Sequence, residues 1–144
     1  MANSGFASYR NGVLKNTANT GDFDPTGVTI KAMFVDHADD TPVAATDDFI
    51  DDIASAARVP ALASCPTLGS KTGGTVATGV FDAADTVFTA LTGDQSESLI
   101  LIRDSGTEST SALIAFWDTA TGLPLTPNGG DVTVVWNASG IYSF

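Results

Sequence analysis

The C-terminal part of the chain alternates between short apolar segments and turn-forming residues at nearly regular spacing. The apolar segments are residues 98–103, 112–117 and 131–136. Each is rich in β-branched and aromatic residues, which favour strands. Segments this apolar must be buried against a second layer, because an isolated hairpin is only marginally stable in water. The pattern therefore predicts an antiparallel β core.

Earlier segments extend the same pattern. Residues 28–35 begin with apolar-polar alternation and end fully apolar, which predicts a strand exposed at its start and buried at its end. Further extended segments are expected at residues 61–70, 76–81, 86–91 and 141–144, with a tight hairpin turn at residues 72–75. A total of about seven to nine strands with frequent turns is typical of a sandwich or a small barrel. We therefore expect an all-β fold, either an antiparallel β-sandwich or a small barrel.

Residues 47–58 show helical periodicity. Thr46 is a suitable N-cap, and the aspartates that follow it suit the positive end of the helix dipole. Phe49, Ile50 and Ile53 fall on one face, and Pro60 ends the pattern. The segment predicts one short amphipathic helix that lies against an edge or end of the sheet.

Composition and charge narrow the class of protein. The 144 residues fit a single β domain, 1–144, with 43% hydrophobic and 16% charged residues. A net charge of -11 repels phosphate backbones, so we expect no nucleic-acid partner. No apolar run has membrane-spanning length, and the first residues lack the order of a signal peptide. We therefore expect no membrane partner, and synthesis in a cytosol.

Few residues offer catalytic chemistry. Cys65 is the only cysteine and His37 the only histidine, and nothing in the sequence ties them together; a small buried thiol and a polar strand-end residue are the simpler interpretations. The sequence contains no nucleophile elbow and no complete phosphate-binding loop. We expect no enzyme activity, no catalytic residue and no cofactor.

Aspartates are concentrated between positions 36 and 52. Their density could suggest a calcium or magnesium site, but the spacing fits no EF-hand loop. A solvated acidic face on the capped helix is the simpler alternative, so no metal is expected. The seven residues are Asp36, Asp39, Asp40, Asp47, Asp48, Asp51 and Asp52.

Two tryptophans end apolar segments. Trp117 and Trp136 could stack on a sugar, anchor an interface or pack in the core. A solvent-facing Trp117 beside the polar loop 118–122 would favour a binding module, and a buried Trp117 a purely structural role.

Several segments, in order, resemble a family of small virion proteins of tailed bacteriophages. They are residues 11–14, 28–35, 47–53, 79–88, 101–107, 111–115 and 123–136, followed by Gly140-Ile141. The resemblance covers most of the chain as a pattern of strands and turns and includes no functional motif.

The resemblance implies a structural virion protein, with a capsid decoration or cement protein that stabilises the head as the first expectation. A neck, tail or appendage component, including a receptor- or carbohydrate-binding module, is the alternative. The implied partners are the major capsid protein or another virion protein, together with further copies of the chain, a trimer above all. The implied location is the virion, after synthesis in the host cytoplasm.

The N-terminal arm, Met1 to Lys15, is the predicted docking element. It contains Phe6, Tyr9 and Arg10, and we expect it to dock on the capsid by strand addition. With Trp117, these residues are the candidate protein-interface residues.

Overall fold

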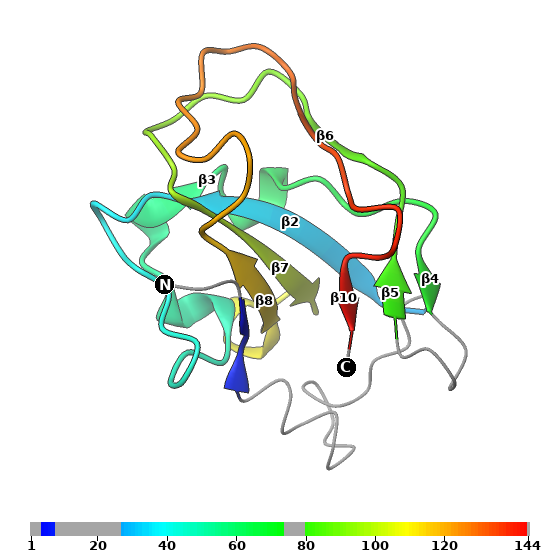
Figure 1. Cartoon of the computed structure of the whole chain (residues 1–144). Helices are drawn as coiled ribbons and strands as arrows, with labels where there is room; N and C mark the ends of the chain where they lie inside the picture. The colour runs from blue at the N-terminus through cyan, green and yellow to red at the C-terminus, as the bar shows by residue number, and fades with distance from the viewer. Residues whose placement is uncertain (1–3, 8–26, 74–79, 144) are drawn as a thin grey trace.

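The computed structural model describes residues 4–7, 27–73 and 80–143. Its largest element is an antiparallel sheet whose centre is formed by β2 (Thr29–Val35), β7 (Ser98–Asp104) and β8 (Ala112–Trp117). The edges are two-residue strands, β1 (Ser4–Gly5) beside β8 and β3 (Arg58–Val59) beside β2. Figure 1 shows the long β2 strand crossing the molecule with β7 and β8 alongside.

The central strands confirm the expected pattern of burial. β2 pairs with β7 along its whole length, from Thr29 opposite Asp104 to Val35 opposite Ser98. Its first residue is exposed and its last four are buried, as the alternation predicted. The first five residues of β7 and of β8 are buried without alternation, so this part of the sheet is covered on both faces.

Two smaller sheets complete the strands of the described residues. One has the order β10-β5-β4, from β10 (Tyr142–Ser143), β5 (Val80–Asp82) and β4 (Thr72–Gly73). The other is a two-stranded ribbon of β6 (Thr86–Phe88) and β9 (Val132–Val134), and Figure 1 shows the orange-red end of the chain running beside the green chain at β6. The fold is β-rich, as predicted, and no sheet within these residues closes into a barrel.

The third apolar segment is less buried than the sequence predicts. Residues 131–136 contribute β9, whose valines are only half-buried, and Val135 is 73% exposed. The segment pairs with β6 alone, so it lies in a ribbon that is not buried on both faces.

The core is built from the central sheet and the segments packed on it. It contains five buried phenylalanines together with aliphatic side chains of β2, β7 and β8, and Cys65 lies among them. The phenylalanines are Phe6, Phe34, Phe81, Phe88 and Phe116.

The predicted helix over residues 47–58 is wrong. The segment forms two single 3-10 turns, η1 (Ile50–Asp52) and η2 (Ser55–Ala57). Further 3-10 turns occur at η3 (Leu62–Ser64) and η4 (Glu108–Thr110).

Tertiary hydrogen bonds explain the difference. An α-helix would pair the Ala54 N–H with the Ile50 carbonyl, but that N–H donates to Asp40 Oδ2 at 2.7 Å. The Ile50 carbonyl accepts instead from the Ile53 N–H at 3.1 Å, the 3-10 pairing, and from Arg58 Nη2 at 3.0 Å. The start of the segment is extended, because Phe49 forms a β-bridge with Ala112.

The expected N-cap is also wrong. The Thr46 hydroxyl donates to Asp47 Oδ1 at 3.1 Å. Asp52 Oδ2 accepts the backbone N–H groups of Asp48 and Phe49 instead.

Candidate functional site

An open apolar groove is the most prominent candidate site. It has a volume of about 600 Å³, within the usual range for ligand sites. It lies between the end of β8, the segment that follows β8, and the chain from β9 to the start of β10. Among the residues that the structure describes, those that line it include no charged group: Phe34, Leu99, Trp117, Ala120, Thr121, Leu123, Leu125, Val132, Thr133, Val134, Val135, Trp136, Asn137 and Ile141, with Gly122 and Gly140.

The central sheet contributes one row of side chains to the groove. Phe34 of β2 is directly opposite Leu99 of β7, and Leu99 is directly opposite Trp117 of β8. Directly opposed residues share a face of the sheet, so these three side chains form a continuous apolar row. Phe34 and Leu99 are buried, and Trp117 at the end of the row is half-buried.

Trp117 meets Trp136 within the groove. Their ring centroids lie 5.8 Å apart at an interplanar angle of 57°. The indole N–H of Trp136 donates to Thr86 Oγ1 at 3.0 Å, and its backbone N–H donates to Asp85 Oδ1 at 3.0 Å. Trp136 is therefore anchored to the chain around β6, and the ring pair joins the ribbon to the central sheet.

The exposure of Trp117 lies between the solvent-facing position expected for a binding module and the buried position expected for a purely structural role. The side chain is half-buried, and it lines the groove together with residues 120–122 of the neighbouring loop. Sequence reasoning identified Trp117 and this loop. It missed β9 and the three residues after it as their partner, because nothing in the local pattern shows that the two segments meet.

Phe6 does not lie on this surface. Its side chain is 0% exposed, its ring packs 5.6 Å from that of Phe116, and its N–H donates to the Ile114 carbonyl at 3.1 Å. The start of the predicted docking arm is thus part of the protein's own sheet and core. Tyr9 and Arg10 lie outside the described residues.

His37 and Cys65 have separate partners. The His37 backbone N–H donates to Glu97 Oε2 at 2.8 Å, and its Nε2 lies 2.9 Å from Ser98 Oγ. The Cys65 thiol points to the Pro60 carbonyl at 3.4 Å, and burial raises the pKa of this thiol to about 12. Cys65 is therefore the inert buried thiol that the sequence favoured, and His37 lies at a strand end as predicted.

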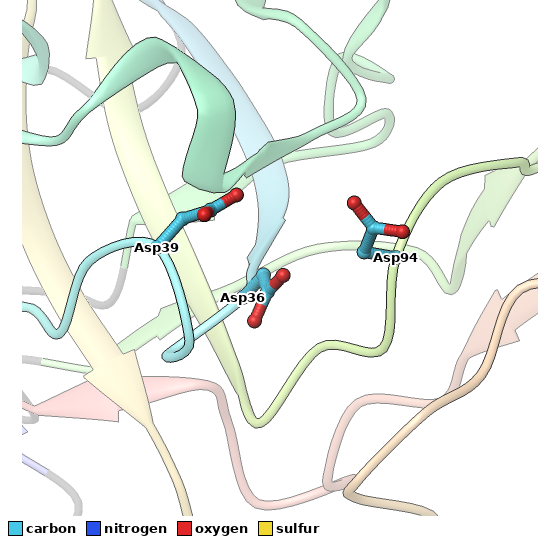
Figure 2. Close-up of side chains that lie close together, drawn as sticks. All are labelled: Asp36, Asp39 and Asp94. Atoms are coloured by element: carbon cyan, nitrogen blue, oxygen red, sulfur yellow. The ribbon is translucent and has the colours of Figure 1, made fainter.

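Three carboxylates gather beyond the end of β2, as Figure 2 shows for Asp36, Asp39 and Asp94. One oxygen from each lies within 4.8 Å of the others; Asp36 is buried, and the other two are exposed. Asp36 Oδ1 already accepts the Ala38 N–H at 2.7 Å. Calcium takes about six to eight oxygen ligands, and these residues offer three.

The acidic stretch identified in the sequence does not form a single cluster. Asp94 joins Asp36 and Asp39 from the loop before β7, whereas Asp40 and Asp52 accept backbone N–H groups in the 3-10 segment. Desolvation and the neighbouring Asp52 raise the pKa of Asp48. The N–H groups of Asp48 and Phe49 outweigh desolvation and lower the pKa of Asp52.

Among the described residues, no helix has the length and apolar character needed to cross a membrane. No protein-family model matches the chain, and no curated protein matches it either.

Proposed function

We propose that this chain is a structural protein of the virion of a tailed bacteriophage, a decoration or cement protein that stabilises the capsid. The observation that carries the proposal is an uncharged apolar groove on a β-rich body whose net charge is -11. A cement protein needs an apolar surface or strand edge to hold adjacent subunits and a charged exterior to keep particles apart. The resemblance to small phage virion proteins points to the same role.

The body has features suited to such a role. β7 and β8 are buried on both faces for most of their length, and β2 is buried over its last four residues, which favours a rigid scaffold. The proposal includes a β-sandwich of about seven to nine strands and a single domain. It includes no catalytic role, no cofactor, and neither a nucleic-acid nor a membrane partner.

The proposed partners are the major capsid protein or another virion protein, with the chain itself forming a homo-oligomer, a trimer above all. Because β1 and Phe6 belong to the protein's own sheet and core, the part of the arm left for docking by strand addition is the part that carries Tyr9 and Arg10. Deleting all of Met1 to Lys15 would also remove Phe6 from the core. The double variant Tyr9→Ala/Arg10→Ala is therefore the cleaner test of the arm.

A second candidate function has one specific observation in its favour. Trp117 and Trp136 are both half-buried in the groove beside the loop 118–122. Tryptophan faces can stack on saccharide rings. A neck, tail or appendage component with a receptor- or carbohydrate-binding module would use this site.

Labelling the protein in intact particles and locating it by electron microscopy tests the proposal. We expect label distributed over the capsid shell, and we expect particles without the protein to lose their genome at lower temperature than complemented particles. Label confined to neck or tail would support the second candidate and contradict the first. A protein absent from purified particles would contradict both.

A further inference from the structure

The strand β9 has an edge that no strand of the described part of the chain covers. Its sheet contains only β6 and β9. The groove is lined by β9 and by the three residues that follow it, so that six consecutive residues, 132–137, border it. Side chains of successive residues lie on opposite faces of a strand. A groove on one face is therefore lined by every second residue, whereas a groove along the strand edge is lined by all of them. No β6 residue lines the groove, so this edge is the one turned away from β6.

Hydrogen bonds just before and just after β9 along the chain show which backbone groups of the strand point to the groove. The Gly130 carbonyl accepts from the Leu91 N–H at 3.0 Å, and the Trp136 N–H donates to Asp85 Oδ1 at 3.0 Å. Both bonds are made on the β6 side. In an antiparallel strand the N–H and C=O of successive residues point to opposite sides. Thr133 and Val135 therefore turn their N–H and C=O groups towards the groove.

The groove is chemically suited to the side chains of an added strand. The row of Phe34, Leu99 and Trp117 is apolar, and Leu123 and Leu125 extend it. A second strand along β9 would place alternate side chains on this surface, the arrangement used in recognition by strand addition. A saccharide would instead need several charged or amide groups around its hydroxyls, and Asn137 is the only such side chain in the lining.

The charge of the protein indicates which kind of added strand would bind in the groove. Asp131 directly precedes β9 and accepts the Ala90 N–H through Oδ1 at 2.8 Å, and Asp85 accepts the Trp136 N–H beyond the other end, so both carboxylates are bound on the β6 side of the strand. The groove itself has no lysine or arginine, and the whole chain carries a net charge of -11. The net negative charge of the protein attracts a strand with basic ends, whereas the like charge of a second copy of this chain disfavours that copy as the occupant of this groove.

We propose that the free edge of β9 and the adjoining groove bind an extended segment of another protein, with alternating apolar side chains and basic residues at its ends. The segment adds as a strand to β9 and places its apolar side chains against Trp117 and the neighbouring groove residues. This inference does not depend on the assignment to a virion.

The direct test uses a short synthetic peptide in which valine and threonine alternate between terminal lysines. Binding is followed by NMR on the labelled full-length chain. We expect hydrogen exchange at the Thr133 and Val135 amides to slow when the peptide is added, while the amides of Val132 and Val134, already paired with β6, change little. A peptide with glutamates in place of the lysines should bind about tenfold more weakly at low salt.

A matched pair of proline variants tests the edge. Val135→Pro removes an N–H that faces the groove, and Val87→Pro removes the corresponding N–H on the far edge of β6, opposite Thr133. We expect Val135→Pro to weaken peptide binding about tenfold or more, the effect of one lost hydrogen bond plus the ring's steric clash with an added strand. Val87→Pro should bind the peptide like the unmodified chain. Circular dichroism checks that both variants are folded.

Four outcomes would overturn the inference. The first is unchanged exchange of Thr133 and Val135 at saturating peptide. The second is equal binding by the two proline variants. The third is a neutral oligosaccharide that shifts the Trp117 and Trp136 indole signals when the peptide does not. Slower exchange at Thr133 and Val135 that depends on protein concentration, without peptide, would identify a second copy as the occupant and also overturn it.

Discussion

The Nζ atom of Lys31 lies 2.9 Å from Oδ2 of Asp104, near the point where β2 begins and β7 ends. Both side chains are largely buried, and Nζ also donates to the Leu62 carbonyl at 3.0 Å. Asp104 accepts a further hydrogen bond from the Gly106 N–H at 2.9 Å. Burial raises the pKa of Asp104, but the hydrogen bonds from Lys31, Gly106 and Ser111 outweigh it, so the pKa lies below the ordinary value of 3.8.

This lowered pKa predicts a contribution to acid unfolding. Because the folded pKa of Asp104 is below the unfolded value of 3.8, its stabilising effect is fully present above that pH and is lost as the pH falls through the folded pKa. We expect Asp104→Asn to lower the free energy of unfolding at pH 7 and to leave a shallower decline below pH 3.8. Urea unfolding across this pH range measures both effects. Parallel curves for the variant and the unmodified chain would contradict the prediction.

Arg58 stabilises the 3-10 segment through backbone carbonyls more than through its ion pair. Its guanidinium donates to the Ile50 and Ile53 carbonyls at 3.0 and 2.7 Å, and to Glu108 Oε1 at 2.7 Å. We expect Arg58→Met to cost about 2–4 kcal/mol, because the Ile53 carbonyl loses both guanidinium donors and the Ile50 carbonyl keeps only the Ile53 N–H. Glu108→Gln should cost under about 1 kcal/mol, because Glu108 is 53% exposed. Equal losses in urea unfolding would show that the ion pair dominates.

The burial of Phe6 predicts that the start of the chain contributes to the stability of the fold. The ring is fully buried against Phe116, so Phe6→Ala should lower the free energy of unfolding by about 3–5 kcal/mol. Val43→Ala serves as the control, because Val43 is exposed and should cost under about 0.5 kcal/mol. A Phe6→Ala variant as stable as the unmodified chain would contradict this prediction.

Two glycines beside the groove allow the energetic cost of backbone strain to be measured apart from the cost of steric overlap. Gly122 and Gly140 both have a positive φ, +96° and +110°. A Cβ at Gly122 meets nothing within 4 Å, whereas a Cβ at Gly140 would overlap Val80 Cγ1 and lie 3.3 Å from the Phe81 carbonyl oxygen.

We therefore expect Gly122→Ala to cost about 1–2 kcal/mol from strain alone. Gly140→Ala should cost more and should disturb the pairing of β10 with β5, because Ile141 donates to Phe81 beside this contact. Thermal unfolding and the NMR signals of Tyr142 measure the difference. Equal destabilisation would mean that Val80 moves aside without cost.

The sequence identified the strands whose burial follows directly from their run of apolar residues. β2, β7 and β8 lie almost where the apolar runs predicted, because a strand covered on both faces needs an unbroken apolar run. For the segment from Asp47 to Arg58, the apolar periodicity predicted an α-helix that does not form. Its helical pattern is real, but Asp40 and Arg58 bind the backbone groups that an α-helix would use.

The candidate site was only half predictable. Trp117 and the loop 118–122 could be identified by residue type, since tryptophan beside polar residues at a strand end is typical of a binding surface. The other wall of the groove, β9 and the three residues after it, could not be identified, because a groove depends on which segments meet in space.

The sequence by itself therefore determined the β-rich class, the central strands, the acidic exterior and the buried, unreactive thiol, because each of these follows from local composition and burial. The tertiary structure alone decided that Phe6 lies in the core, that residues 47–58 form 3-10 turns, and that Trp117 and Trp136 meet across a groove. These features depend on contacts between residues far apart in the chain. Local periodicity carries no information about such contacts.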